Sequence, residues 1–166
     1  MTTSLMKRPS RLAPGSIAVR SSSIHGTGVW AVRPIPRGAR ILEYTGERIS
    51  VAEADRRYDG LEGRPEGLIV LFQIEDDRVI DAGRGGNNAR FVNHSCEPNC
   101  ESVLEDGRVF IRALRDIDPG EELAYDYKLR HETAADPETA ARFTCRCGAP
   151  SCRGTLLARR RRGRKG

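Results

Sequence analysis

The sequence has no apolar run close to the roughly 20 residues that a membrane-spanning helix needs. No apolar segment follows the basic residues Lys7 and Arg8 near its start, so we expect no secretory signal peptide. Aromatic residues make up only 5% of the chain, and a core would therefore consist mainly of Val, Ile, Leu and Ala. From these absences we expect neither an integral membrane protein nor a secreted disulfide-rich scaffold.

Acidic residues are missing from both ends of the chain. Residues 1–11 hold three basic side chains and residues 159–165 hold six, with no acid in either segment. The net charge of +5 is thus concentrated at the ends, and residues 12–158 carry a net charge of −4. A mildly acidic body fits a basic, lysine-containing protein or peptide better than a phosphate backbone. The basic run 159–165 fits either contact with nucleic acid or a solvated end.

Cysteines are few and odd in number, five in all, which favours a metal site in a reducing compartment over disulfides. Three of them form a C-x-C-x4-C cluster at residues 145–152. Structural Zn²⁺ takes four tetrahedral ligands, so the cluster lacks one, which Cys96, Cys100 or His131 could supply. A segment this short has no core of its own and would need the metal to fold. The alternative is three unrelated buried thiols.

Short β-branched runs separated by turn residues predict a mainly β fold without βαβ alternation. Residues 51–61 have the pattern of a helix, with Ser50 as N-cap and Glu53 at the capping-box position. Residues 130–142 are polar and rich in Ala, which fits a short helix or a linker. The expected strands lie within 16–32 and 39–50, in a hairpin of 68–74 with 78–82, and at 101–104, 109–113 and 121–128.

Three further segments carry residues that could form a site, although each is a weak indication by itself. The Gly-x-Gly turn after His25 lets a backbone approach a ligand closely. The pair Asn93-His94 could equally be a polar turn. Tyr125 and Tyr127 lie two residues apart, so they would share one face of a strand and could be ordinary half-buried aromatics.

Taken together and in order, these segments resemble the SET-domain lysine methyltransferases. The strings HGTGVWA, ILEYTGERIS, VIDA, GNNARFVNHSCEPNC, GEELAYDYKL and CRCGAPSCRG follow one another between about residues 16 and 157. They are most similar to the trithorax type, in which NHSCEPNC and ELTYDYK-like strings occur. The resemblance implies a flexible arm at 1–15, a SET domain of small β-sheets with a knot-like core at 16–128, a linker or short helix at 129–143, a post-SET zinc segment at 144–158 and a basic tail at 159–166.

The resemblance also implies an activity: a protein-lysine N-methyltransferase that moves a methyl group from S-adenosyl-L-methionine to a lysine ε-amine of a histone or another basic protein. The catalytic residues by motif are Tyr127, Tyr44 and Tyr125. The cofactor-binding residues are His25, Gly26, Thr27, Gly28, Trp30, Arg90, Asn93, His94 and Arg146. The zinc ligands are Cys96, Cys145, Cys147 and Cys152, which leaves Cys100 as a small buried residue.

Two positions bear on the product. Tyr125 falls at the family's product-specificity position, where a tyrosine hydroxyl can hold a water in the room that added methyl groups need. We therefore expect mainly monomethylation, with dimethylation as the alternative. Val70 stands where trithorax-type enzymes have a tyrosine, so a channel or cofactor contact is missing there, which predicts weaker activity or a wider product range.

Two other functions explain part of the sequence. A catalytically silent SET module that binds a partner fits Val70 but not the three retained tyrosines. A small zinc-dependent nucleic-acid-binding protein explains the cysteines and the basic tail but leaves the GTGVWA, NHSC and YDY strings unused. The expected location is the cytoplasm of a bacterium, or the nucleus and chromatin of a eukaryote or a host.

Overall fold

The computed structural model describes residues 12–58, 70–130 and 136–158 of the 166-residue chain. The basic tail, the candidate ligand His131 and most of the N-terminal arm lie outside these ranges. None of the described helices is long and apolar enough to cross a membrane. The elements in chain order are β1 (Ile17–Ser21), β2 (Thr27–Ala31), β3 (Arg40–Tyr44), β4 (Glu47–Ser50), α1 (Val51–Tyr58), β5 (Leu71–Glu75), β6 (Arg78–Asp81), the 3-10 helix η1 (Asn88–Phe91), β7 (Asn93–His94), β8 (Cys100–Glu105), β9 (Arg108–Ala113), β10 (Glu122–Tyr125) and α2 (Pro137–Arg142).

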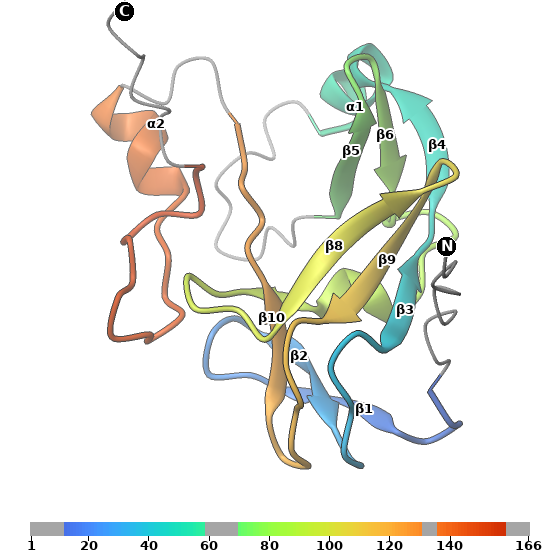
Figure 1. Cartoon of the computed structure of the whole chain (residues 1–166). Coiled ribbons are helices and arrows are strands. Elements are labelled where there is room, and N and C mark those ends of the chain that lie inside the picture. The colour runs from blue at the N-terminus through green and yellow to red at the C-terminus, as the bar shows by residue number, and fades with distance from the viewer. Residues whose placement is uncertain (1–11, 59–69, 131–135, 159–166) are drawn as a thin grey trace, which may run out of the picture.

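The fold is mainly β, as predicted, and a seven-stranded sheet forms its centre (Figure 1). Its strands follow the order β1-β2-β10-β8-β9-β3, and β7 pairs with β10 away from this path. Strands β8 and β9 form a hairpin through Asp106 and Gly107, whose φ angles are 50° and 71°. Two consecutive positive φ angles are typical of the type I′ turn, whose twist matches that of the strands.

Strand β7 brings two distant sequence motifs side by side. Asn93 pairs with Ala124 and His94 with Tyr125 in parallel register. Tyr125 also pairs in parallel with Cys100, the first residue of β8. Parallel neighbouring strands cannot be joined by a tight turn, so a long connection must lead from the end of one strand back to the start of the other. The NHS and YDY strings therefore meet at β10.

A second, three-stranded sheet of order β4-β6-β5 lies with α1 at the opposite end of the molecule from β1 and β2 (Figure 1). Its β5–β6 part is the predicted hairpin. Helix α1 begins after Ser50, whose hydroxyl accepts the Glu53 N–H at 3.2 Å, as an N-cap should. The Glu53 carboxylate does not complete a capping box but binds Arg57 and Arg56, at 2.8 and 2.6 Å. The predicted residues 59–61 of this helix lie outside the described part of the chain.

Strand β10 is shorter than predicted and ends at Tyr125. The backbone N–H of Tyr127 donates to Nδ1 of His94 at 3.1 Å. It is therefore bonded to a side chain and not to the backbone carbonyl of a neighbouring strand. The prediction that Tyr125 and Tyr127 lie on one strand is therefore wrong. Their rings nevertheless lie together, with centroids 4.8 Å apart.

The main core is aliphatic, in line with the few aromatic residues. Its largest fully buried side chains include Ile35, Ile111, Ile117 and Leu123. Cys100 lies in the same cluster with no exposed surface, and burial raises the pKa of its thiol to about 12. It therefore stays neutral and packs as a small apolar residue, as expected.

Candidate active site and metal centre

The three tyrosines predicted to be catalytic lie in one aromatic cluster with Phe72. Ring centroids are 5.4 Å apart for Tyr44 and Phe72, 6.4 Å for Phe72 and Tyr125, and 4.8 Å for Tyr125 and Tyr127. These separations are those of interacting aromatic pairs. The cluster collects residues from the ends of β3 and β10, from β5 and from the loop after β10. Phe72 was not among the predicted site residues. The sequence did contain a signal for it: Phe72 follows Val70 by two residues in a predicted strand, so the two side chains share one face of that strand.

The hydroxyls in this cluster have different partners. Tyr44 donates to the backbone carbonyl of Val70 at 2.9 Å, and Tyr127 donates to that of Val92 at 2.8 Å. Among the residues that the structure describes, none forms a hydrogen bond with the hydroxyl of Tyr125. Val70 lacks the hydroxyl of the tyrosine that trithorax-type enzymes have at this position, but its backbone carbonyl still holds the hydroxyl of Tyr44.

Burial keeps the three tyrosines neutral. It raises the pKa of Tyr44 above its usual value of 10, and the nearby Asp81 carboxylate adds to the effect. Burial likewise raises the pKa of Tyr125 and of Tyr127. At neutral pH these hydroxyls are therefore hydrogen-bonding groups and not anionic bases.

His94 connects the tyrosine cluster to the cysteines. Its Nδ1 accepts the backbone N–H of Tyr127, so in the neutral ring the proton lies on Nε2, which faces the sulfur of Cys96 at 3.4 Å. The ring is 2% exposed, and burial lowers its pKa. Because both nitrogens are engaged inside the protein, this histidine is suited to hold other groups in place and not to remove a substrate proton.

Four cysteines form a compact sulfur cluster. Their Sγ atoms all lie within 4.8 Å of one another, with Cys96 3.7 Å from Cys145 and 3.9 Å from Cys152; the fourth member is Cys147. Sulfurs about 2.3 Å from a tetrahedral Zn²⁺ would be about 3.8 Å apart. The cluster therefore fits a metal ion. Of the candidates for the fourth ligand, the structure brings Cys96 to the cluster and buries Cys100 in the core.

Backbone N–H groups surround the sulfurs. Arg153 donates to Cys96 at 3.3 Å, and Gly154 donates to Cys152 at 3.4 Å. Burial would raise the pKa of Cys147, but hydrogen bonds from the N–H groups of Cys96 and Ala149 and from the neighbouring thiols lower it to about 6, whereas burial raises the pKa of Cys96 and of Cys145. Backbone N–H donors stabilise thiolates, which are the form that binds metal.

The predicted cofactor residues fall into two groups. The turn from Ser22 to Gly28 contacts Asn93, whose Nδ2 lies 3.3 Å from the carbonyl of His25 and 3.1 Å from that of Thr27. Gly26 in this turn has a φ of 45°, which suits a glycine. The turn thus lies against Asn93, whereas the side chain of the next residue, His94, contacts Cys96 and Tyr127.

The second group is more dispersed. Trp30 lies within β2, against which η1 with Arg90 packs, and Arg146 is exposed between two of the clustered cysteines. The buried atoms Trp30 Nε1 and Arg90 Nε have no hydrogen-bond partner among the described residues. Buried polar atoms usually have partners, so both are available to a ligand.

Residues 26–128 match the family described as SET domain. This chain belongs to the SET-domain family. It is 44% identical over 139 residues to the "Histone-lysine N-methyltransferase, H3 lysine-4 specific" of Kluyveromyces lactis, covering 81% of this chain and 14% of that protein. The protein of the same name from Candida albicans is 45% identical over 139 residues, covering 81% and 13%. "Histone-lysine N-methyltransferase trithorax" of Drosophila virilis is 41% identical over 141 residues, covering 82% and 4%.

These comparisons confirm the resemblance to SET domains, including the trithorax type. The chain spans at most 14% of the length of these three relatives. The match to the family ends at residue 128, before the three C-terminal cysteines of the sulfur cluster.

An ion pair fastens the C-terminal segment to the SET domain. The guanidinium of Arg153 donates two hydrogen bonds of 2.8 Å to Asp126, which lies between Tyr125 and Tyr127 in the sequence. The two side chains are 12% and 21% exposed. Burial would raise the pKa of Asp126, but the hydrogen bonds from Arg153 outweigh it, so the pKa is lowered.

Replacing Arg153 by Leu should therefore lower the free energy of unfolding by about 2 kcal/mol, since it leaves a half-buried carboxylate unpaired. Arg115→Leu is the matched control, because its bidentate pair with Glu121 is more exposed, at 55% and 30%, and should cost less than about 1 kcal/mol. Urea unfolding measures both changes. Equal losses would show that the ion pair has no special role.

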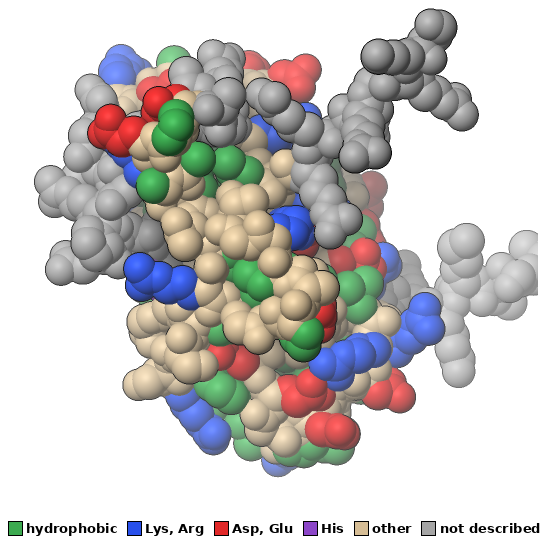
Figure 2. Space-filling model, turned by 90° about the vertical axis from the view of Figure 1, so that its left-hand side faces the viewer, with side chains coloured by type: hydrophobic (Ala, Val, Ile, Leu, Met, Phe, Trp, Pro, Cys, Tyr) green, Lys and Arg blue, Asp and Glu red, His purple; other side chains and the backbone are tan. Residues whose placement is uncertain are grey.

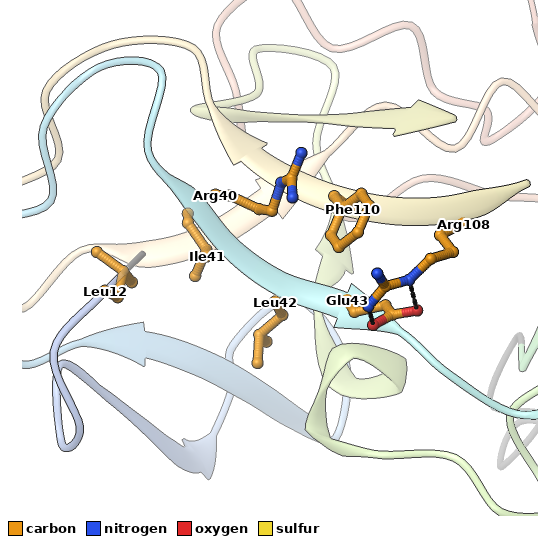
Figure 3. A pocket seen from close by; sticks show the side chains of 7 residues that line it. All are labelled: Leu12, Arg40, Ile41, Leu42, Glu43, Arg108 and Phe110. Atoms are coloured by element: carbon orange, nitrogen blue, oxygen red, sulfur yellow. Dashed lines mark hydrogen bonds and ion pairs between the residues drawn. The ribbon is translucent and has the colours of Figure 1, made fainter. Parts of the chain in front are cut away.

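A cavity of about 410 Å³ lies along β3 and β9, on another part of the SET domain (Figure 3). Arg108 and Glu43, which form an ion pair, are among the residues that line it, and none of the predicted site residues does. The lining residues are Leu12, Arg40, Ile41, Leu42, Glu43, Arg108 and Phe110.

Proposed function

We propose that this chain transfers a methyl group from S-adenosylmethionine to the ε-amine of a lysine in a basic protein, with histone H3 as the first substrate to test. The tyrosine cluster beside Asn93 and His94, within a SET domain, carries the proposal. The names of the relatives from Kluyveromyces lactis and Candida albicans, which specify lysine 4 of histone H3, support this choice of substrate. A chain that acts on histones would be nuclear and chromatin-associated in a eukaryote or a host.

The charge of the body supports a basic substrate. On the face that carries the cysteine segment, Asp and Glu side chains are interspersed with Lys and Arg (Figure 2). The residues between the basic ends have a net charge of −4. A body with a net negative charge attracts a lysine-rich peptide more than a phosphate backbone.

When bound, S-adenosylmethionine supplies a methyl group on a positively charged sulfur. The chain's own residues orient the lysine and favour its uncharged form. A free lysine has a pKa of about 10.4, and burial beside the aromatic rings disfavours the ammonium. The neutral hydroxyl of Tyr125 and the carbonyl of Val92 can accept N–H groups of the amine and so orient its lone pair, whereas the carbonyl of Val70 already accepts from Tyr44 and from the N–H of Ala82. Catalysis of this kind is mostly positioning.

The rate should consequently rise with pH between about 7 and 9, because a larger fraction of the lysine loses its proton. The raised pKa values of the three tyrosines keep their hydroxyls protonated across this range, so no second ionisation should reduce the rate. Initial rates measured together with circular dichroism test this. A falling rate in folded protein over the same range would contradict it.

We propose that Cys96, Cys145, Cys147 and Cys152 hold a structural Zn²⁺. The proposal is supported by the sulfur spacing, the N–H donors and an all-thiolate ligand set, which is typical of structural zinc. Such an ion would join the C-terminal segment to the loop after β7. It would order the end of the chain next to His94 and Tyr127.

Tyr125 is proposed to limit the number of methyl groups added. Its hydroxyl is free to hold a water molecule, since no described residue bonds to it. Tyr125→Phe should therefore increase the share of dimethylated and trimethylated lysine several-fold. Mass spectrometry of an H3 peptide compares the two proteins at equal total methyl transfer. Identical product ratios would contradict this role.

The activity itself is tested with S-adenosylmethionine and H3 peptides, one with lysine 4 and one with arginine in its place. Methyl groups on lysine 4 alone would support the proposal. No transfer to H3 peptides or core histones, in protein that binds S-adenosylmethionine and zinc, would favour a silent SET module. Salt-dependent DNA binding that disappears on deletion of residues 159–166 would support a nucleic-acid contact through the basic tail.

A further inference from the structure

Glu122 on β10 connects two parts of the proposed cofactor site. Its Oε1 accepts from Nδ2 of Asn93 at 2.8 Å, and its Oε2 accepts from the hydroxyl of Ser22 at 2.9 Å. One carboxylate therefore holds both β7 and the turn that follows β1. Glu122 was not among the site residues predicted from the sequence.

The contact with Ser22 organises the turn. The oxygen of Ser22 accepts the N–H of Ile24 at 3.0 Å, and the Ser22 N–H donates to the carbonyl of Gly26 at 2.9 Å. Glu122 also occupies the space beside Gly28, where an added Cβ would lie 2.2 Å from Oε1. An alanine at this position would therefore force the Glu122 carboxylate, which Asn93 and Ser22 hold in place, to move.

The contact with Asn93 orients its amide. A carboxylate only accepts hydrogen bonds, so it requires the Nδ2 side of the amide, as do the carbonyls of His25 and Thr27. The hydroxyl oxygen of Ser22 is a fourth acceptor near Nδ2, at 3.1 Å, so the Oδ1 side must face away from all four, and no described residue donates to it. Asn93 is 4% exposed, so the orientation of its amide decides which group a ligand meets.

We propose that Glu122 is a positioning residue for the cofactor. It holds the turn from Ser22 to Gly28 and presents Oδ1 of Asn93 as an acceptor for the ammonium group of S-adenosylmethionine. Hydrogen bonds between an ammonium and an oxygen acceptor are among the stronger ones in proteins. The inference rests on the proposed function, and Glu122 acts through Asn93 and the turn.

Glu122→Gln tests this with nearly the same side-chain shape. The dissociation constant of S-adenosylmethionine, measured by calorimetry, should increase about tenfold. The kcat at saturating cofactor should change less than about threefold, because the tyrosine cluster is untouched. Glu121→Gln is the matched control, since the adjacent Glu121 pairs with the exposed Arg115, and its dissociation constant should equal that of the wild type. Thermal unfolding and zinc content verify that each variant is folded.

A double-mutant cycle isolates the contact with Gly28. Gly28→Ala should weaken cofactor binding in the wild type but have a smaller effect in Glu122→Ala, where the carboxylate is gone and only the Cβ of Ser22, at 3.1 Å, remains close to the added Cβ. Equal effects in both backgrounds, or wild-type binding by Glu122→Gln, would overturn the positioning role and leave the methyltransferase proposal intact. A wild-type chain that binds no S-adenosylmethionine would overturn both.

Discussion

Tyr127→Phe is expected to lower the rate of methyl transfer about 100-fold, the usual scale for losing one well-placed hydrogen-bonding group. The hydroxyl of Tyr127 holds the carbonyl of Val92 at 2.8 Å, at the point where the chain enters β7. The ring itself should stay in place, because Tyr125 and His94 pack on it with centroids 4.8 and 5.3 Å away. Transfer of labelled methyl groups to core histones measures the loss.

The same substitution at Tyr58 provides the control. Its hydroxyl donates to the buried Asp81 at 2.7 Å, so Tyr58→Phe also removes one hydrogen bond from a buried acceptor. Both variants should lose about 1 to 2 kcal/mol of stability, but only Tyr127→Phe should lose activity. A Tyr127→Phe protein with more than a third of the wild-type rate would contradict the catalytic role.

Loss of the metal is the second change expected to have a large effect. Wild-type protein should contain one zinc per chain, and Cys152→Ser should release it and reduce methyl transfer more than 100-fold. Zinc binding to a structural site is worth on the order of 10 kcal/mol, far more than the Arg153–Asp126 ion pair that would remain. The C-terminal segment would then separate from Cys96, and the sulfur that faces Nε2 of His94 would lose its metal and the other three cysteines.

Cys100→Ala is the control for this experiment, since it removes a buried thiol outside the sulfur cluster. It should retain one zinc per chain, with only a small loss of stability from the cavity it leaves. Mass spectrometry under native conditions and a colorimetric zinc assay give the stoichiometry. Full zinc content in Cys152→Ser, or its loss in Cys100→Ala, would contradict the assignment of the ligands.

Much of the fold could be predicted from short stretches of sequence. The hairpin β5–β6, the turn at Asp106 and Gly107, and the N-cap at Ser50 all depend on residues within a few positions of one another. The prediction was wrong where a distant side chain intervened. At Tyr127 the ring of His94 takes the backbone N–H and ends the strand.

The candidate site was predicted through its motifs and only partly through its chemistry. The tyrosines and the NHS string could be identified because the family places them in a fixed order. Phe72 and Glu122 could not, because a phenylalanine in a strand or a glutamate beside another glutamate is common. The roles proposed for them rest on contacts between distant parts of the chain: Phe72 with Tyr44 and Tyr125, and Glu122 with Asn93.

By itself, the sequence determined the local elements, the mainly β class and the resemblance to SET domains. Turn residues, the alternation of apolar and polar residues, and the order of the motifs can all be recognised without knowing the tertiary structure. The cysteine spacing alone left the fourth member of the sulfur cluster open; the family resemblance pointed to Cys96, and only the tertiary structure gives the physical reason for it. Cys96 and Cys100 are close in sequence, but Cys100 begins β8 beside Tyr125 and faces the core, whereas Cys96 lies in the loop that meets the C-terminal segment. The pairing of β7 and β8 with β10 separates them, and such long-range pairing leaves no signal in local sequence.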